Sequence, residues 1–462
     1  MGNASQIMIG FGARRGALAL ASAAVLALAA CSDREVRLPG ERFSIDVPLS
    51  ATLPTADGAV PARALSDPSA GDAPQAISLP APTRLGTWTS RGYNSFNRVP
   101  HAALAGNLTN VWTADIGRGN TRRNRITADP VAADGRIFTM DSRAGVVATS
   151  ITNGGRLWDT DLQPGFDRDG AVSGGGLALG GGRLYASTGF GELVAMDPAS
   201  GQVLWRQRLD AGIGAPTYVN GIVYIVSRNN QAWSINAENG RIDYQIPSLD
   251  AESVLPGGAA PAVGNGLIVF PFGSGELMGV SQSTGTQRWS LTVAGNRGGF
   301  AYSAINDITG DPVIAGGRIY AGNQSGRVVA IDPALGSRIW TAEEGAYSPV
   351  LVTGADLFFV SDRNELIRLS SSAGNRIWGT PLPLYVNDRE RRRRAVFTHY
   401  GPILAGGRLI LASGDGNIRL FSPESGQLVG AVELRDGAAA HPIVVNDILL
   451  VVTEDGELQA FR

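Results

Sequence analysis

The sequence predicts an all-β protein, an eight-bladed β-propeller built from four-stranded antiparallel blades. The prediction rests on two repeated signals. The first is a Gly or Asn at a hairpin tip before a short apolar stretch, a residue type that tolerates the positive φ of tight turns. The second is a Gly four residues before a bulky aromatic ring. The tips recur about every 44 residues, a period typical of a propeller blade, at Gly145, Gly191, Asn230, Gly275, Gly326, Asn364, Gly416 and Gly456.

The Gly-to-aromatic spacing predicts how the blades pack. Rings in a shared register are expected to lie between neighbouring blades, where they bury a large apolar area. A seventh copy keeps Gly426 but has Gly430 where the ring is expected. The six complete copies are Gly154-Trp158, Gly201-Trp205, Gly240-Tyr244, Gly285-Trp289, Gly336-Trp340 and Gly374-Trp378.

One blade can be read strand by strand in the best-preserved copy. The four predicted strands cover residues 312–315, 318–321, 327–331 and 338–341. Gly316-Gly317, Ser325-Gly326 and the segment 332–336 supply the turns between them. Each strand has the usual length for a globular protein.

The ends of the repeat region predict how the ring closes. The last copy begins near Pro442 and ends with the chain at Arg462, so it lacks a fourth strand. The segment 110–116 carries Trp112 and reads as an orphan fourth strand. Pairing the two segments completes blade eight and covers otherwise exposed strand edges. The propeller is therefore expected to span residues 108–462.

The first 30 residues are predicted to be a lipoprotein signal peptide. Arg14-Arg15 precede an apolar run that ends near Leu28, followed by Cys31, the only cysteine of the chain. The pattern resembles a bacterial lipobox, which makes Cys31 the lipid attachment residue and, with Ser32 next to it, implies the periplasmic face of the outer membrane. A transmembrane helix is the alternative, but the run is shorter than the roughly 20 residues that span a bilayer.

Residues 31–107 are predicted to be a lipid-anchored flexible tether and lead-in. The segment from Ser32 to about Gly86 is rich in Pro, Ala and Ser. Such a composition buries too little apolar surface to offset the entropy of ordering.

Composition excludes several classes of function. The formal net charge of −2 gives no electrostatic basis for nucleic acid or an anionic membrane surface as the main partner. A single cysteine excludes an internal disulfide and a cysteine metal cluster. The three histidines, His101, His399 and His441, lie far apart and lack metal-ligand spacing. No catalytic residue, metal site or cofactor is predicted.

The repeat carries a family resemblance. Ala195, Asp197, Gly201 and Trp205 follow a spacing that resembles the quinoprotein-type propeller repeat. Together with the lipobox, the eight copies resemble the BamB family, lipoproteins of the machinery that inserts β-barrels into bacterial outer membranes. The resemblance implies a non-enzymatic scaffold. It also implies binding to the BamA-like barrel insertase through that protein's periplasmic POTRA domains.

The resemblance also implies a contact surface on two inter-blade loops, residues 249–258 and 304–311. Leu255 falls on a family Leu and Asp307 on a family Asp. Val254 and Ile308 lie beside them and would add apolar area to the partner-binding surface.

Two positions in these loops depart from the family pattern. Pro256 stands in place of the family's Arg, and Thr309 in place of its second Asp. Ordinary long propeller loops are the alternative interpretation. A second binding mode is open beside loop contacts to a fixed partner, namely strand addition to an exposed blade edge by an unfolded outer-membrane protein.

Other functions fit the sequence less well. A periplasmic oxidoreductase using pyrroloquinoline quinone would share the repeat, but its calcium needs several oxygen ligands. Here Asp residues recur at turn positions, as in Asp197-Pro198 and Asp332-Pro333. A glycan-binding or other ligand-binding propeller lacks a repeated aromatic platform. The run from Arg389 to Arg394 reads as a solvated loop, or as a docking site for an acidic partner or lipid headgroups.

Overall fold

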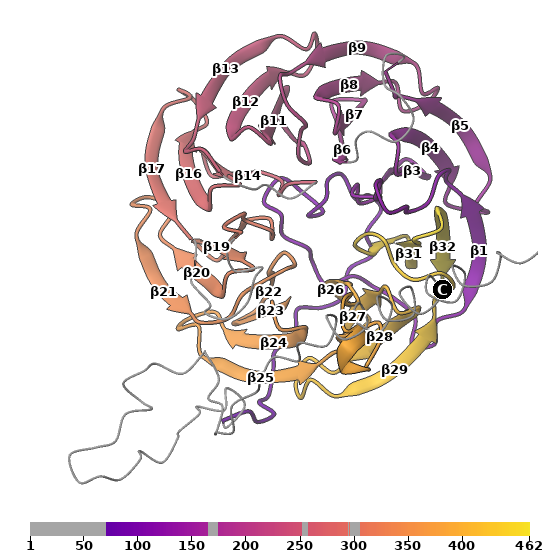
Figure 1. Ribbon diagram of the computed structural model, residues 1–462, viewed down its shortest axis with the longest axis vertical. Coiled ribbons are helices and arrows are strands. Elements are labelled where there is room, and N and C mark those ends of the chain that lie inside the picture. The colour runs from indigo at the N-terminus through magenta and orange to yellow at the C-terminus, as the bar shows by residue number, and fades with distance from the viewer. Residues whose placement is uncertain (1–70, 165–173, 252–256, 294, 296–304) are drawn as a thin grey trace, which may run out of the picture. The chain divides into compact units, whose positions relative to one another are not determined.

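The computed structural model describes residues 71–164, 174–251, 257–293, 295 and 305–462. Eight four-stranded antiparallel sheets follow one another around a ring, so the predicted eight-bladed propeller is confirmed (Figure 1). Apart from strands, the described residues contain one short 3₁₀ helix, η3 (Glu390–Arg392). None of the helices in these ranges is long and apolar enough to cross a membrane.

The first four blades have strands of three to six residues. Blade 1 is β2 (Val131–Ala133), β3 (Arg136–Met140), β4 (Gly145–Ser150) and β5 (Arg156–Asp161). Blade 2 is β6 (Gly175–Gly180), β7 (Arg183–Thr188), β8 (Glu192–Met196) and β9 (Val203–Arg208). Blade 3 is β10 (Thr217–Val219), β11 (Ile222–Ser227), β12 (Gln231–Asn236) and β13 (Ile242–Pro247). Blade 4 is β14 (Ala262–Gly264), β15 (Leu267–Pro271), β16 (Glu276–Ser281) and β17 (Gln287–Thr292).

The remaining blades repeat this order from the ring axis outward. Blade 5 is β18 (Val313–Ala315), β19 (Arg318–Asn323), β20 (Arg327–Ile331) and β21 (Arg338–Ala342). Blade 6 is β22 (Leu351–Thr353), β23 (Asp356–Val360), β24 (Glu365–Ser370) and β25 (Arg376–Pro381). Blade 7 is β26 (His399–Ala405), β27 (Arg408–Ser413), β28 (Asn417–Phe421) and β29 (Leu428–Glu433). Blade 8 is β30 (Ile443–Val445), β31 (Ile448–Val452), β32 (Glu457–Phe461) and β1 (Asn110–Asp115).

Blade 8 closes the ring as predicted. β1 pairs antiparallel with β32, with Trp112 opposite Ala460 and Asp115 opposite Glu457. The last three strands of the chain therefore acquire their fourth strand from the start of the repeat region. This pairing protects the edge of β32, which would otherwise present unpaired N–H and C=O groups.

The hydrophobic core lies between blades. One cluster joins the inner strands of blades 1 and 2, another those of blades 5 and 6, and the other junctions follow the same pattern. Inner strands such as β18 are buried along their whole length, whereas outer strands such as β9 alternate between partly buried and exposed residues. This difference is expected, because an inner strand is covered on both faces and an outer strand has one face in water.

The predicted hairpin tips adopt left-handed backbone at seven of eight positions. Gly191, Gly416 and the other tips have positive φ, and Asn230 and Asn364 have φ of 56°. In the first copy the positive φ falls on Ala144 (68°), one residue before the expected Gly145.

The tether prediction is wrong for residues 71–107. These residues, here called the strap together with residues 108 and 109, cross the middle of the ring along the inner strands (Figure 1). Trp88 and Ala132 of β2 exchange two backbone hydrogen bonds of 2.7 Å. The Ala102 carbonyl accepts a hydrogen bond from the Gly406 N–H, and the Ala102 N–H donates to the Leu404 carbonyl of β26. Composition alone indicated flexibility because the partner strand edges lie far away in sequence.

The strap also inserts apolar side chains into the core. Leu85 and Trp88 are buried in the cluster shared by blades 7, 8 and 1. At its start, Asp72 accepts hydrogen bonds from the Arg376 guanidinium and from the Gly379 N–H of β25. The strap therefore runs from the outer strand of blade 6 to the axis. Residues 1–70, which include the predicted signal peptide and Cys31, lie outside the described residues.

Candidate functional site

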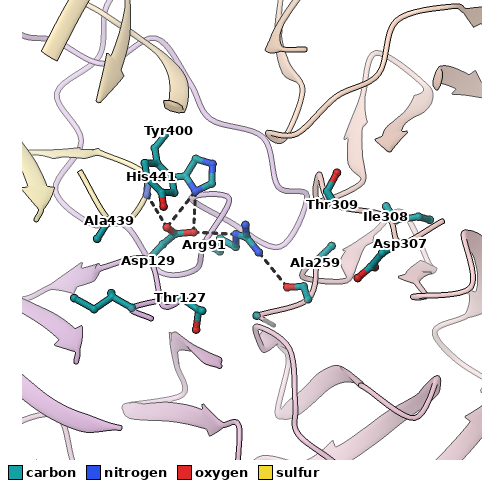
Figure 2. Close-up of a pocket in the computed structure, with 13 residues that line it drawn as sticks. Arg91, Thr127, Asp129, Ala259, Asp307, Ile308, Thr309, Tyr400, Ala439 and His441 are labelled. Carbon is teal, nitrogen blue, oxygen red and sulfur yellow. Dashed lines mark hydrogen bonds and ion pairs between the residues drawn. The ribbon is translucent and has the colours of Figure 1, made fainter. Parts of the chain in front are cut away.

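A polar pocket lies on the propeller axis, where the strap meets the segments that lead into the first strands of several blades (Figure 2). Its cavity measures about 210 Å³. It is lined by Arg91, Ile126, Thr127, Asp129, Gly257, Gly258, Ala259, Asp307, Ile308, Thr309, Tyr400, Ala439 and His441. We call it the axial pocket.

Arg91 reaches the axial pocket from a tight turn of the strap. The Tyr93 N–H donates to the Ser90 carbonyl, and the ring of Tyr93 packs edge-on against Trp88 with centroids 5.3 Å apart. Trp88 is in turn fixed by its backbone pairing with β2. The turn therefore holds the Arg91 side chain in one place.

Arg91 connects blades that are distant in sequence. Its Nε lies 2.9 Å from Asp129, which precedes blade 1, and 3.5 Å from Asp311, which precedes blade 5. Its Nη1 donates to the Gly258 carbonyl, before blade 4, at 3.0 Å. The two carboxylates are almost fully shielded from solvent, and the Arg91 side chain is 15% exposed. One guanidinium thus links the segments that precede blades 1, 4 and 5.

His441 completes this cluster from blade 8. Its N–H donates to Asp129 at 2.7 Å, and Nδ1 lies 3.1 Å from the same carboxylate. Its ring packs edge-on against Tyr400, with centroids 5.5 Å apart. The Ala260 N–H donates to Asp311 at 2.8 Å on the opposite side.

The two carboxylates experience different electrostatic environments. Burial alone would raise the pKa of Asp129, but the charges of His441 and Arg91 and their hydrogen bonds hold it below its usual value. Burial raises the pKa of Asp311, since Arg91 is more distant and offsets the desolvation only in part. Burial also raises the pKa of Tyr400 to about 12, so its hydroxyl stays protonated at neutral pH.

The pocket does not fit a calcium-bound quinone. Calcium needs six or more oxygen ligands, and the carboxylates of Asp129 and Asp311 are both paired with the Arg91 guanidinium. No group of three or more His, Cys, Asp or Glu side chains within the described ranges has metal-binding geometry. The cavity is also smaller than the roughly 300 Å³ at which ligand pockets usually begin.

Of the four predicted site residues, the structure describes Asp307 and Ile308, and both are buried. Val254 and Leu255 lie outside the described residues. Asp307 lines the axial pocket and is 4% exposed. Ile308 is 1% exposed and packs in the cluster between blades 4 and 5. Thr309, also on the pocket wall, donates to the Ala346 carbonyl at 2.8 Å. The role of the four predicted residues in partner binding stays a prediction.

Sequence reasoning missed the central cluster. Arg91 lies in the segment predicted to be the tether and lead-in, and His441 is one of three histidines that lie far apart in sequence and lack metal-ligand spacing. No local motif marks either residue, because their partners lie tens to hundreds of positions away in sequence. Asp residues in the turns between strands did carry a sequence signal. The turn role expected for Asp197 and Asp332 is confirmed, because each carboxylate accepts a hydrogen bond from the backbone N–H two residues on.

Comparisons with known proteins agree with this fold. The family model for "Outer membrane protein assembly factor BamB" matches residues 142–380, just over half of the chain. The chain belongs to the BamB family. BamB of Yersinia pestis is 25% identical over 361 residues, which cover 76% of this chain and 88% of that protein.

Solved structures show the same propeller. BamB from Moraxella catarrhalis superimposes with a TM-score of 0.61 at 16% identity, covering 77% of this chain and all of that one. Quinohemoprotein alcohol dehydrogenase from Comamonas testosteroni also reaches 0.61 at 14% identity, covering 82% and 81%. The structural likeness therefore establishes the fold and does not by itself separate BamB proteins from dehydrogenases.

Proposed function

We propose that this BamB-family protein is a non-enzymatic scaffold lipoprotein on the periplasmic face of the outer membrane, anchored through Cys31. It holds a BamA-like barrel insertase through the inter-blade loops around the axial pocket. Membership of the BamB family supports the assembly role. The ionic cluster at the axis supports a structural use of the buried charges, since each carboxylate there already has a partner.

One observation carries the choice of surface. The two loops that the family resemblance selected, residues 249–258 and 304–311, are about 50 positions apart in sequence. Gly257 and Gly258 of the first loop and Asp307 to Thr309 of the second line the same axial pocket. Figure 2 shows the second group facing the pocket from the side opposite Tyr400 and His441. A partner domain could therefore contact both loops at once.

The burial of Asp307 and Ile308 refines this proposal. Because both side chains are shielded, they are expected to shape the pocket wall, and the apolar contact falls to Val254 and Leu255. Interface energy commonly concentrates in a few central side chains surrounded by contacts that exclude water. Leu255 is proposed as one of these few side chains.

A co-purification tests the proposal. The full-length tagged chain is extracted with mild detergent, and its partners are identified by mass spectrometry. Recovery of a barrel insertase by the native chain, with loss by a Leu255→Arg variant, is the expected result. A native chain that recovers no insertase, or that co-purifies with a bound quinone, would overturn it. Electrophoretic mobility of a Cys31→Ser variant after metabolic labelling with a fatty acid tests the anchor separately.

A further inference from the structure

Blade 6 and blade 7 are joined by a hairpin, residues 384–397, here called the arginine hairpin. The Phe397 N–H donates to the Leu384 carbonyl at 2.9 Å, and Val386 donates to Ala395 at 3.0 Å. Tyr385 and Val396 form a bridge between its two arms. The segment is therefore ordered by backbone pairing, whereas a solvated loop was the leading interpretation of its sequence.

The base of the hairpin is fixed to the propeller. Asn364 Nδ2 donates to the carbonyls of Pro383 and Phe397 at 3.3 and 3.1 Å, one on each arm. The His399 ring hydrogen-bonds to the Pro383 carbonyl and to the Ser413 hydroxyl at 2.8 and 2.7 Å. A base held in this way projects the tip in a defined direction and lowers the entropy lost on binding.

The tip concentrates positive charge. Arg389, Arg391, Arg392, Arg393 and Arg394 are all exposed. Arg393 lies over the Tyr385 ring at 4.8 Å from its centroid and donates to the Asp388 carbonyl at 3.1 Å. Among the side chains that the structure describes, no carboxylate forms an ion pair with these arginines. The tip therefore presents several guanidinium groups directly to solvent.

Apolar side chains accompany this charge. Val386 is 54% exposed and Val396 is 51% exposed, and both lie on the arms just behind the arginines. Exposed aliphatic residues beside a basic cluster are typical of surfaces that rest on a membrane, where phosphates meet the cation and the apolar groups enter the interface. A purely polar acidic partner would leave the two valines in water.

The path of the chain supports a membrane as the occupant. The strap begins on β25, where Asp72 contacts Arg376 and Ala73 donates to the Ile377 carbonyl at 3.1 Å. The arginine hairpin follows the end of β25 at residue 381. The segment before residue 71, which carries the predicted lipid on Cys31, therefore joins the propeller on the same blade that bears the hairpin.

We propose that the arginine hairpin is a membrane-contact site that binds the phosphate groups of anionic lipids and orients the propeller on the bilayer. Bidentate guanidinium donors suit phosphate oxygens. Orientation of the propeller on the bilayer rests on the lipid anchor of the proposed function. Binding of the arginine hairpin to lipid phosphates does not depend on that anchor.

Flotation of the full-length Cys31→Ser chain tests the contact without the lipid. The vesicles contain phosphatidylcholine alone or phosphatidylcholine mixed with phosphatidylglycerol. We expect binding to the mixed vesicles that weakens at high salt. Replacing Arg391 and Arg392 with Gln should reduce it by at least about 10-fold, since each basic residue near an anionic surface contributes about a five-fold gain.

A matched pair of exposed arginines supplies the control. Arg122→Gln with Arg123→Gln removes the same charge from another loop and should leave binding within about two-fold. Equal losses from both double variants, or no binding of the Cys31→Ser chain to mixed vesicles, would overturn the proposal. Competition by inorganic phosphate at the lipid phosphate concentration would also overturn it, by assigning the hairpin to a free anion.

The two proposals fail in different ways. If the native chain does not float with pure phosphatidylcholine, the lipid anchor is wrong, while binding to mixed vesicles still reports on the hairpin. In the anchored native chain, trypsin cleavage between residues 389 and 394 should slow on mixed vesicles and stay fast on pure phosphatidylcholine. Unchanged cleavage on both surfaces would contradict the contact.

Discussion

The indole ring of Trp158 in blade 1 packs directly on Gly201 in blade 2. Its Nε1 donates to the Pro198 carbonyl at 3.1 Å, in the same turn as Gly201. A Cβ on Gly201 would lie 2.5 Å from the ring, closer than real Cβ contacts allow. The Gly and the ring of the repeat therefore belong to one contact, made between a ring in one blade and a glycine in the next.

The same contact joins seven of the eight blade junctions. The ring of each outer strand packs on the following turn glycine, in the pairs Trp112–Gly154, Trp158–Gly201, Trp205–Gly240, Tyr244–Gly285, Trp289–Gly336, Trp340–Gly374 and Trp378–Gly426. Blade 7 has Gly430 in the ring position. A ring there would need a turn between the third and fourth strands of blade 8, and those strands come from opposite ends of the chain. The missing aromatic thus follows from the way the ring closes.

Substitution of Gly201 by Ala tests this contact. Gly201 has φ of +73°, so the variant suffers both backbone strain and a clash with Trp158. We expect a loss of about 2–4 kcal/mol in the free energy of unfolding, measured by urea denaturation. Gly182→Ala is the control, since Gly182 has the same φ of +73° and open space around it. A similar loss in both variants would show that backbone strain alone explains the effect.

Substitution of Arg91 by Met should destabilise the propeller. It leaves the carboxylates of Asp129 and Asp311 buried without their shared cation. Breaking a buried pair by removing one partner costs about 3–5 kcal/mol. Adding Asp311→Asn should restore part of the loss, because a neutral amide is cheaper to bury.

An exposed arginine provides the comparison for this prediction. Arg156, whose side chain is 42% exposed, pairs with Asp115 at 2.8 Å. Its replacement by Met should cost less than about 1 kcal/mol. Thermal melting under one buffer condition compares the native chain, the Arg91→Met variant, the Arg91→Met Asp311→Asn double variant and the Arg156→Met variant. Equal losses of stability from Arg91→Met and Arg156→Met would contradict a structural role for the axial cluster.

His399 predicts a pH dependence of stability. Burial lowers the pKa of His399 below its usual value of 6.5, although the bond to the Pro383 carbonyl partly opposes this. The unfolded chain therefore takes up a proton at a higher pH than the folded chain. Stability present above about pH 6.5 should fall as the pH decreases toward the folded pKa.

The His399→Gln variant isolates this effect. Gln cannot take up the proton, so the variant should show a smaller decrease in unfolding midpoint between pH 7 and pH 5 than the native chain. Parallel curves for the two proteins would assign the pH dependence to other groups.

Partner binding should depend on Leu255 and Asp307 without a matching loss of stability. Leu255→Arg is expected to weaken insertase binding by about 2 kcal/mol or more, if Leu255 is a central interface residue. Asp307→Asn tests the pocket wall with a change small enough for a buried site. Val429→Arg, at an exposed position of an outer strand, is the matched control. Isothermal titration with a purified insertase domain measures all three, and unfolding of the Leu255 variant would leave the surface unsupported.

The fold could be predicted from the sequence because every blade repeats the same local pattern of strands and turns. Residues 312–341 were divided correctly into four strands, since apolar alternation, turn glycines and the Asp332 turn act over a few residues. The pairing of β1 with β32 was predictable as well. An unpaired strand at each end of a closed ring leaves one arrangement that satisfies both edges.

The axial site could not be predicted in the same way. Arg91, Asp129, Asp311 and His441 are brought together by blades 1, 5 and 8 and by the strap, and each is ordinary in its own sequence window. The arginine hairpin lies between these cases. Its charge was visible in the sequence, but its paired arms and its position beside the start of the strap were not.

The sequence by itself therefore determined the number of blades, the strand order, the closure and the family, because these depend on periodic local preferences for turns and burial. The tertiary structure alone decided that residues 71–107 are ordered and that buried charges meet at the axis. Hydrogen bonds and ion pairs between segments tens to hundreds of residues apart decided both, and such contacts leave no mark on local composition.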